Sequence, residues 1–573
     1  MPEDLSMSTD SLSVVLSGQA GQGIQTVEYI ITRLLKLSGY NVFSTKEYMS
    51  RVRGGTNSTE IRISSRRVCA PVDQIDIFVP LSQGAIPHLK RRISSKTLIL
   101  GQKEILGNEY HKNGQRVIEV PFSKIASEIG SPIYSNTVAV GVISGLLKVE
   151  LGILTDYLKQ HFSAKGESVI RKNIQAAEKG HRIALDLLSS GRIKFKIPRS
   201  LSVTDEILLN GTEAVALGAI AGGCNFLSFY PMSPATGVSV FLARHSEDFD
   251  IIVEQVEDEI CALNMVIGAW YAGGRAMAST SGGGFALMEE GLSLAGMLES
   301  PVVIHLAQRP GPATGLPTRT EQADLELALY AGQGEFPRII LAPGTIEDAF
   351  YLTQSAFNLA DKYQVPVFVL TDQYLLDSYY NIASLDLSGM KIEKHTVKTD
   401  QEYKRYRLTE KGISPRGIPG YGDGIVVVDS DEHDEEGHIT EDLDIRQRMV
   451  EKRLKKLELI SHEIISPQLI GSENYRILLL GWGSTYHVIK EALHHLKRED
   501  LSFLHFSQVY PLHPDTTEYL KRAEKTVVIE NNATSQFGRL IRLHTGIEIE
   551  KRVLKYNGLP FSVEEIVRNL KPY

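Results

Sequence analysis

The chain has 573 residues, too many for one hydrophobic core, and this length suggests roughly three or four domains of ordinary size. Hydrophobic residues make up 42% of the chain and charged residues 23%, which is usual for a globular protein. The formal net charge of −8 is mild and argues against a nucleic-acid partner.

The N-terminus and the cysteines limit the expected location and metal content. Residues 1–13, MPEDLSMSTDSLS, are polar and acidic, so they do not resemble a signal peptide, and no apolar run is long enough to cross a bilayer. The three cysteines, Cys69, Cys224 and Cys261, are too widely spaced to ligate an iron–sulfur cluster or a structural zinc. We therefore expect a cytoplasmic protein with no membrane contact and no metal site of its own.

Residues 1–195 are predicted to form an α/β domain, because strand-like and helix-like patterns alternate. The stretch 194–200, KFKIPRS, is typical of a linker. The elements that support this prediction are strands at 12–17, 75–81 and 97–102 and helices at 25–40 and 170–190.

Two more α/β units are predicted downstream. One spans residues 196–380, and the other spans residues 471–573. Residues 381–470 between them are predicted as a connecting excursion with an acidic run at 429–444, which lacks the spacing of a metal-binding loop and is expected to be solvated. The strands that indicate the two units lie at 300–307, 338–343, 366–372, 476–483, 502–512 and 526–533.

The loop Tyr230-Pro-Met-Ser-Pro-Ala-Thr-Gly237 follows a small-residue helix pattern and a short strand-like run. Pro231 and Pro234 flank Ser233, fix two φ angles and remove two backbone donors, so this loop cannot join a sheet or a helix interior. A stiff loop at the end of an α/β strand is where such folds present side chains to ligands. A plain structural turn is an equally good interpretation of the loop by itself.

Glu259 is the strongest candidate for a catalytic group. The spacing places it on one helical stripe with Val256, Leu263, Val266 and Trp270, in a segment that is apolar on nearly every side. We expect this helix to be buried or to lie at an interface. A carboxylate there is costly unless it is paired or its pKa is raised.

A second interpretation of Glu259 is structural. Residues 257–259 are all acidic and stand at the start of the predicted helix, where negative side chains are favourable without any catalytic role.

Gly282, Gly283 and Gly284 follow a predicted strand that ends in Ser279-Thr-Ser281. Three glycines in this position allow a ligand or another chain to approach the backbone closely. A flexible turn is the alternative.

Arg309 follows the apolar strand PVVIHLA and begins a rigid loop, RPGPATGLPT. A guanidinium at the end of a strand, near Thr314 and Thr318, suits bidentate binding of a carboxylate or phosphate. The alternative is a solvated loop arginine in a weak ion pair.

The N-terminal loop at 18–23, GQAGQG, does not fit a dinucleotide fingerprint, since Ala20 stands where glycine is needed and Glu47 does not lie at the tip of the next strand. Its glycines before a helix still suit an anion. The segment 51–58, RVRGGTNS, combines two arginines with a glycine pair and suits phosphates, unless it is a solvated loop.

These motifs together resemble the thiamine-diphosphate-dependent 2-oxoacid:ferredoxin oxidoreductases, and the chain is similar to their alpha subunit with a gamma domain fused at its N-terminus. Two departures stand out: the family has glycine at the position of Ala20, and Ile-Thr-Pro-Ser where Met232 to Ala235 stand. Ser233 keeps the hydroxyl. The motifs that carry the resemblance are 18–23, 51–58, 230–237, 257–264, 279–285, 308–318 and 527–532.

The resemblance implies three α/β domains: a gamma domain, a pyrimidine-binding domain like that of transketolase, and a domain like the transketolase C-terminal one. It also implies a separate beta subunit that holds the thiamine diphosphate, Mg²⁺ and a [4Fe-4S] cluster. Two alpha–gamma chains would assemble with two beta chains and pass electrons to ferredoxin.

The resemblance also implies roles for residues of this chain. A protonated Glu259 would hydrogen-bond the pyrimidine N1′ of thiamine, with Pro231 and Gly282 to Gly284 beside the cofactor. Catalysis and substrate binding would fall to Ser233 and Arg309, with Tyr230 and Thr318 as further substrate contacts. For coenzyme A we expect phosphate contacts from Gly21, Gln22, Gly23, Arg51, Arg53, Gly54, Gly55 and Thr56.

The implied reaction converts a 2-oxoacid and CoA into an acyl-CoA, CO2 and reduced ferredoxin, or runs in reverse as reductive carboxylation. The fused layout is most similar to 2-oxoglutarate enzymes, which by analogy makes 2-oxoglutarate the expected substrate. Pyruvate or an aryl-pyruvate is the alternative substrate. A regulatory subunit that binds CoA or a nucleotide without catalysis is the alternative class.

Overall fold

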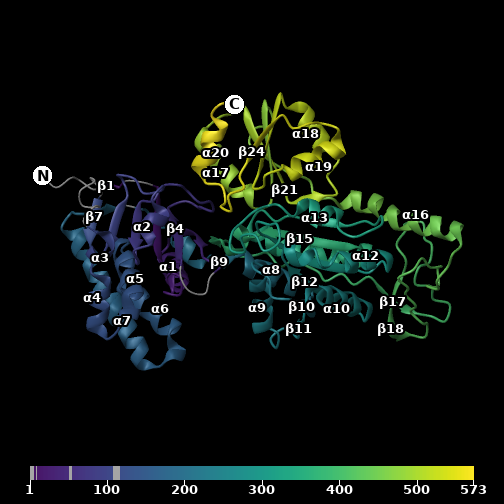
Figure 1. The fold of residues 1–573 in the computed structure, drawn as a ribbon, viewed down its shortest axis with the longest axis horizontal. Coiled ribbons are helices and arrows are strands. Elements are labelled where there is room, and N and C mark those ends of the chain that lie inside the picture. Colours follow the sequence, from purple (N-terminus) through teal and green to yellow (C-terminus); the bar gives the residue numbers. More distant parts are fainter. Residues whose placement is uncertain (1–5, 8–9, 51–54, 108–115, 196) are drawn as a thin grey trace. The chain divides into compact units, whose positions relative to one another are not determined.

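The computed structural model describes residues 6–7, 10–50, 55–107, 116–195 and 197–573 (Figure 1). The chain is α/β, as the sequence predicts, and it divides into two compact units. No helix in the described ranges is long and apolar enough to span a bilayer. The N-terminal unit consists of Met1–Leu209, Asp377–Ser384 and Ser562–Glu565; the C-terminal unit consists of Asn210–Leu376, Leu385–Phe561 and Ile566–Tyr573.

The N-terminal unit is built on an eight-stranded mixed sheet with the order β7-β6-β5-β2-β4-β3-β16-β9. Strands β7, β6, β5 and β2 are parallel, whereas β4 is antiparallel to β2 and β3, and β16 is antiparallel to β3. The strands are β2 (Ser11–Gln19), β3 (Asn41–Glu47), β4 (Thr56–Ser64), β5 (Ile77–Pro80), β6 (Leu98–Gly101), β7 (Arg116–Glu119), β9 (Ile207–Asn210) and β16 (Tyr379–Ile382).

The expected linker at 194–200 contributes a short pairing instead, because β8 (Lys194–Phe195) pairs in parallel with β1 (Ser6–Met7). The helices of this unit are α1 (Ile24–Leu37), α2 (Ala85–Leu89), α3 (Lys103–Leu106), α4 (Phe122–Ile129), α5 (Ser135–Leu146), α6 (Leu151–His161) and α7 (Glu167–Ser189).

Helices α5 and α7 pack backbone to backbone through two glycines. A methyl group added at Gly141 would lie 2.1 Å from the carbonyl oxygen of Ala177, and one at Gly180 would lie 2.2 Å from that of Val138. Neither contact is possible for a residue with a side chain, so glycine sets the approach of the two helices.

The C-terminal unit contains a seven-stranded sheet with the order β11-β10-β12-β13-β15-β14-β22. All neighbours are parallel except β22, which is antiparallel to β14. Every residue of β13 and β15 is buried, as expected for apolar strands that are covered on both faces. The strands are β10 (Phe226–Phe229), β11 (Ile252–Gln255), β12 (Ala276–Thr280), β13 (Val302–Gln308), β14 (Ile339–Leu341), β15 (Pro366–Asp372) and β22 (Gln508–Tyr510).

A second sheet of this unit has five strands in the order β19-β21-β20-β23-β24. Its core strands β21, β20, β23 and β24 are parallel, and β19 is an antiparallel edge. The strands are β19 (Gln468–Ile470), β20 (Ile477–Trp482), β21 (Leu501–Phe506), β23 (Lys525–Glu530) and β24 (Lys551–Leu554).

Helices connect the strands of both sheets, and several begin at side-chain caps that the sequence supplies. Asn210 and Glu213 form a reciprocal capping box at the start of α8, and Thr345 caps α14. The helices are α8 (Gly211–Ala221), α9 (Thr236–Arg244), α10 (Glu259–Tyr271), α11 (Gly282–Phe285), α12 (Glu289–Met297), α13 (Leu325–Tyr330), α14 (Ile346–Tyr363), α15 (Gln373–Asp377), α17 (Tyr486–Leu496), α18 (Thr516–Arg522), α19 (Gln536–Thr545) and α20 (Val563–Leu570).

Residues 385–470 carry a parallel pair, β17 (Thr396–Thr399) and β18 (Arg416–Gly422), and the long helix α16 (Leu443–Ile460). The prediction that the acidic run is solvated is wrong in part. Glu432 accepts hydrogen bonds from Arg453 at 2.8 and 3.0 Å, and His433 is fully buried against the ring of Tyr406. The run therefore holds α16 in place.

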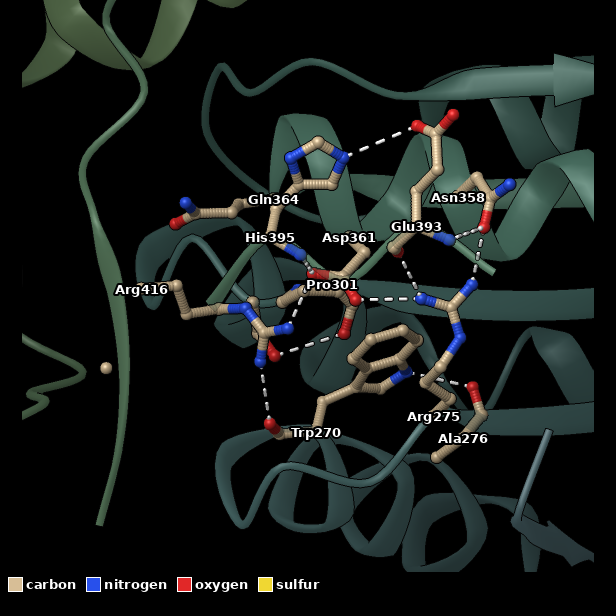
Figure 2. Close-up of polar contacts among 12 residues, drawn as sticks. Trp270, Arg275, Ala276, Pro301, Asn358, Asp361, Gln364, Glu393, His395 and Arg416 are labelled. Atoms are coloured by element: carbon tan, nitrogen blue, oxygen red, sulfur yellow. Dashed lines mark hydrogen bonds and ion pairs between the residues drawn. The ribbon is translucent and has the colours of Figure 1, made fainter. Parts of the chain in front are cut away.

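A buried carboxylate, Asp361 on α14, ties this segment to the seven-stranded sheet. Figure 2 shows Asp361 between the guanidinium groups of Arg275 and Arg416, with Trp270 next to them. The ion pairs measure 2.8 Å to Arg275 and 2.6 Å to Arg416, and all three side chains are at most 6% exposed. The backbone N–H of His395 also donates to Asp361, at 3.3 Å.

We predict that Asp361→Asn lowers the free energy of unfolding by about 3–5 kcal/mol, because it leaves two buried guanidinium groups without their counter-charge. Denaturant unfolding followed by fluorescence of the two tryptophans measures this. Asp423→Asn is the control, since Asp423 is exposed in the same segment. A loss no larger than that of the control would contradict the prediction.

Candidate active site

Four segments with predicted functional residues follow four adjacent strands of the seven-stranded sheet. Residues 230–235 follow β10, Glu259 follows β11, Gly282 to Gly284 follow β12, and Arg309 follows β13. Since these strands are parallel, their carboxyl ends lie at one edge of the sheet. That edge is the usual ligand-binding position in an open α/β sheet.

Glu259 is the first residue of α10, directly after the helix cap Asp258, whose side chain accepts a hydrogen bond from the Cys261 N–H at 2.8 Å. The side chain of Glu259 is buried, with 2% of its surface exposed. Its Oε1 atom has no hydrogen-bond partner within the described ranges. Burial raises the pKa of the Glu259 carboxyl, and Arg309 only partly offsets this. The carboxyl thus favours its neutral form more than an exposed glutamate does.

The predicted helical stripe is correct for the residues that follow Glu259 and wrong for the residue that precedes it. Leu263, Val266 and Trp270 are fully buried on the same helix, whereas Val256 lies before the helix begins. The opposite face is exposed and partly apolar: Ile260 is 45% exposed and Tyr271 38%.

The three glycines after β12 start α11, and two of them make room for carboxyl groups. A methyl group added at Gly284 would lie 2.3 Å from Oε1 of Glu259, and one at Gly282 would lie 2.4 Å from Oδ1 of Asp324. The same group at Gly283 would have 3.5 Å to its nearest neighbour, the carbonyl oxygen of Ala313. Gly282 and Gly284 are therefore required by the protein's own acidic side chains.

Arg309 is not a solvated loop residue, because it is only 8% exposed. Its Nη1 donates to the backbone carbonyl of Ser233 at 2.7 Å, and its Nε has no partner among the residues described. Burial lowers the pKa of the guanidinium, while Asp324 and Glu259 raise it. The structure thus brings Arg309 to the loop of Ser233 and places both carboxyls within its electrostatic reach.

The other predicted contacts of this site differ in exposure. Ser233 and Pro231 are exposed, and Tyr230 is 39% exposed. Thr318 is half-buried, and within the part of the chain that the structure describes no hydrogen bond joins it to Ser233 or Arg309. Thr318 is thus the least supported of the predicted substrate contacts.

Sequence reasoning missed Asp324 and Ser281. Asp324 stands after the Pro/Gly loop, and its backbone N–H donates to Oε1 of Gln308 at 3.0 Å. Ser281 is fully buried, and its Oγ has no partner in the described part of the chain. Ser281 stands at the predicted strand end, but its burial without a partner shows only in the folded chain, and Asp324 has no recognisable spacing to a strand end.

In the N-terminal unit the structure brings together the two glycine-containing motifs. Gln19 at the end of β2 pairs with Thr56 at the start of β4, and the Ala20 N–H donates to the Gly55 carbonyl at 3.1 Å. Gly21 and Gly23 have φ values of 88° and 77°, and α1 begins after them.

Among the described residues, no side chain caps the start of α1, so the N–H groups of Ile24 and Gln25 are left for a ligand, and Gln22 lies in the same loop. Arg51, Arg53 and Gly54 lie outside the described residues.

Within the described ranges, no group of three or more His, Cys, Asp and Glu side chains is arranged to hold a metal ion.

Two protein families match long stretches of this chain. Residues 217–452 match the family described as pyruvate flavodoxin/ferredoxin oxidoreductase, thiamine diphosphate-binding, and residues 13–183 match the family described as pyruvate ferredoxin/flavodoxin oxidoreductase. The first match includes Glu259, Gly282 to Gly284 and Arg309.

Individual relatives are subunits of enzymes that act on 2-oxoacids. The chain is 33% identical to the 2-oxoacid:ferredoxin oxidoreductase subunit alpha of a Sulfolobus species, over 97% of this chain and 96% of that one. It is 32% identical to the 2-oxoglutarate synthase subunit KorA of Archaeoglobus fulgidus, over 57% of this chain and 88% of that one.

Among solved structures, the 2-oxoglutarate:ferredoxin oxidoreductase of Magnetococcus marinus with 2-oxoglutarate, coenzyme A and succinyl-CoA bound superposes with a TM-score of 0.92. It is 32% identical and covers 98% of this chain and 99% of that one.

The chain therefore belongs to the 2-oxoacid:ferredoxin oxidoreductases, as an alpha subunit. It is a subunit of an enzyme, and the designation alpha implies a partner subunit. The family expected from the sequence motifs is confirmed, and so is the α/β fold with a thiamine diphosphate-binding domain.

The residues present fit the pyrimidine ring of thiamine. A ring nitrogen that needs a hydrogen-bond donor would match the buried, unpaired Oε1 of Glu259, whose raised pKa favours the protonated form.

We predict that Gly284→Ala and Gly282→Ala each destabilise the chain by about 1–3 kcal/mol, because each methyl group would overlap a buried carboxyl. Thermal unfolding at fixed pH measures both. Gly283→Ala is the matched control in the same turn and should change the midpoint little. Equal effects at all three positions would show that the turn, and not the carboxyls, requires glycine.

Proposed function

We propose that this chain, with a beta subunit, converts 2-oxoglutarate and CoA into succinyl-CoA and CO2 and delivers the electron pair to ferredoxin. The same site would run the reductive carboxylation in reverse. The observation that carries the proposal is the buried Glu259 with its unpaired Oε1, at one sheet edge with Arg309. The bound ligands of the Magnetococcus marinus enzyme and the name of the Archaeoglobus fulgidus relative favour 2-oxoglutarate.

Glu259 would act as the proton-holding group of the site. Bound thiamine diphosphate supplies the nucleophilic carbon and the electron sink for decarboxylation. The protonated Glu259 carboxyl would donate a hydrogen bond to the pyrimidine N1′. Its burial favours the neutral form, and Gly284 leaves the space that its side chain occupies.

Arg309 and the loop of Ser233 would bind the substrate. The guanidinium holds the Ser233 carbonyl through Nη1 and keeps Nε for a ligand. A carboxylate of the 2-oxoacid would accept a hydrogen bond from Arg309 Nε and provide a negative charge beside the guanidinium. The exposed Ser233 hydroxyl, with Tyr230, would contact the substrate oxygens. Pro231, Gly282 and Gly283 stay predicted cofactor contacts, and Thr318 a predicted substrate contact.

The beta subunit would supply the diphosphate and Mg²⁺ site, the [4Fe-4S] cluster and the contact with ferredoxin, in an assembly of two alpha–gamma and two beta chains. An exposed stripe of α10, with Ile260 and Tyr271, supports a partner surface beside Glu259. A groove of about 1310 Å³ begins at Ile260 and runs along α12 to α16. Both features suit a protein partner.

The N-terminal unit would bind coenzyme A at the loop that joins β2 to α1. The uncapped start of α1, the amides of Gly21 to Gly23 and the adjacent Thr56 suit phosphate oxygens. Arg51 and Arg53 would add bidentate phosphate contacts. The Magnetococcus marinus relative binds coenzyme A, which supports CoA as a ligand of this chain.

The alternative substrates are pyruvate and aryl-pyruvates. The alternative class, a non-catalytic subunit that binds CoA or a nucleotide, gives no reason for a buried glutamate with a raised pKa and an unpaired oxygen.

Glu259→Gln should assemble with the beta subunit and lower kcat on the order of 10²- to 10⁴-fold, since the amide cannot hold and release the proton. The assay is ferredoxin or dye reduction by the reconstituted complex with 2-oxoglutarate, pyruvate and an aryl-pyruvate. Glu257→Gln, at an exposed position two residues earlier, is the control.

Three outcomes of this assay are decisive. The highest kcat/KM on 2-oxoglutarate supports the substrate assignment, and a higher value on pyruvate overturns it. No turnover of any 2-oxoacid by the wild-type complex contradicts the function itself.

Arg309→Lys should lower kcat/KM for the 2-oxoacid on the order of 10- to 100-fold with little change in assembly, because lysine keeps the charge but loses the planar fork. Steady-state kinetics measure this, with the exposed Arg244→Lys as the control. An unchanged kcat/KM would remove Arg309 from the substrate site.

A further inference from the structure

Four buried polar atoms without a hydrogen-bond partner lie in the segments that form the candidate site. Unpaired buried polar atoms are rare in folded proteins, because each costs free energy until a partner is supplied. Within the described ranges, these atoms of the site are Glu259 Oε1, Ser281 Oγ, Arg309 Nε and Asp324 Oδ2.

Asp324 has no role in the function proposed above, although its position is as well defined as that of Glu259. Its backbone N–H is bound by Gln308, the residue before Arg309. Its carboxyl lies against Gly282, where a methyl group would be only 2.4 Å from Oδ1. Asp324 thus occupies the space at the first residue of α11, and Glu259 the space at the third.

The C-terminal domain, residues 471–573, fixes the loop that carries Asp324. Gln322 donates to the Trp482 carbonyl at 2.9 Å and accepts from the Asn531 N–H at 3.0 Å. Gln536 donates to the Ala323 carbonyl at 2.8 Å. Three buried or partly buried hydrogen bonds on the residues next to Asp324 leave its carboxyl little freedom to move.

The charge state of Asp324 is set by its surroundings. The pKa of its carboxyl is raised to about 7, mainly by burial and also by Glu321 in the same loop, and Arg309 limits the rise. Glu259 acts on the same guanidinium from α10. Below about pH 7 the carboxyl is neutral and can donate a hydrogen bond.

With both carboxyls protonated, Glu259 would donate to the pyrimidine N1′, and the three remaining groups, Ser281 Oγ, Arg309 Nε and the Asp324 carboxyl, can each donate a hydrogen bond to the substrate. A 2-oxoacid anion offers only acceptors, in its keto and carboxylate oxygens. The chemistry of the site therefore matches the ligand when Asp324 is neutral. An ionised Asp324 would lose the donor and repel the substrate anion.

We propose, on the basis of the function above, that the protonated carboxyl of Asp324 binds the substrate by donating a hydrogen bond to an oxygen of the 2-oxoacid beside Arg309. Asp324 is then a substrate-binding residue, and substrate affinity falls when this residue ionises.

The first test is the pH dependence of KM for 2-oxoglutarate in the reconstituted complex. Wild-type KM should rise above about pH 7. Asp324→Asn keeps a donor that does not titrate, so its KM should stay close to the low-pH wild-type value across the range. Asp324→Ala loses the donor, and its KM should be about tenfold higher at every pH, with a smaller change in kcat.

The control is Asp348→Asn. Asp348 also has a pKa raised by burial, but its carboxylate accepts the Gly344 N–H at 3.2 Å in the cap of α14. This variant should keep the wild-type dependence of KM on pH.

The second test needs no activity. Burial lifts the pKa of Asp324 from 3.8 to about 7 on folding, so the isolated wild-type chain loses stability relative to Asp324→Asn as pH rises through this window. The thermal midpoint of Asp324→Asn should exceed that of the wild type increasingly from pH 4 to 7, and by a constant amount above.

The outcomes separate the two proposals. If the wild-type complex turns over 2-oxoacids but Asp324→Asn keeps the wild-type rise of KM, or if the thermal midpoints show no pH-dependent difference, the role of Asp324 is overturned and the proposed function stands. If the complex turns over no 2-oxoacid, the proposed function fails, and the substrate-binding role of Asp324 fails with it. Thermal midpoints that follow the expected pH dependence would then show only that Asp324 titrates near pH 7 in the folded chain.

Discussion

The site depends on the space that Gly282 and Gly284 leave for two acidic side chains. In most buried turns a carboxyl is excluded or paired, because taking it from water without a partner is costly. Here Glu259 and Asp324 lie against the two glycines, each with one oxygen that no described residue satisfies. These unpaired oxygens lie at the carboxyl ends of the parallel strands, where α/β folds bind their ligands. A bound ligand there can form the missing hydrogen bonds and offset the free-energy cost of burial.

The surrounding structure keeps these groups fixed. Gln308, the last residue of β13, joins the loop of Asp324 to the strand that precedes Arg309, and Gln322 joins it to Trp482 at the end of β20. Asp361, on the helix before β15, pairs with Arg275 at the start of β12 and with Arg416 of the 385–470 segment. Buried polar contacts of this kind have specific geometry, so they hold the positions of strand ends that apolar packing alone leaves less defined.

Much of the fold and part of the site follow from the sequence. Continuous apolar runs such as 302–308 predict buried parallel strands, and the motifs around Glu259 and Arg309 predict a family that the comparisons confirm. Those residues stand next to strand ends, where a linear pattern is informative.

Other features depend on contacts between distant segments and leave no local pattern. Asp324 faces Gly282 across more than forty residues, and nothing near it in the sequence shows that its carboxyl is buried. Val256 fits the helical stripe by spacing, but Asp258 caps the helix after it. The acidic run at 429–444 has the composition of a solvated segment. Glu432 nevertheless accepts a hydrogen bond from Arg453, which lies on the helix that follows the run.

The most direct test is a crystal structure of the assembled complex with thiamine diphosphate bound. We predict that Oε1 of Glu259 lies within hydrogen-bond distance of the pyrimidine N1′, with the Glu259 carboxyl still packed against Gly284. A pyrimidine ring bound elsewhere, with Glu259 Oε1 still unpaired, would contradict it.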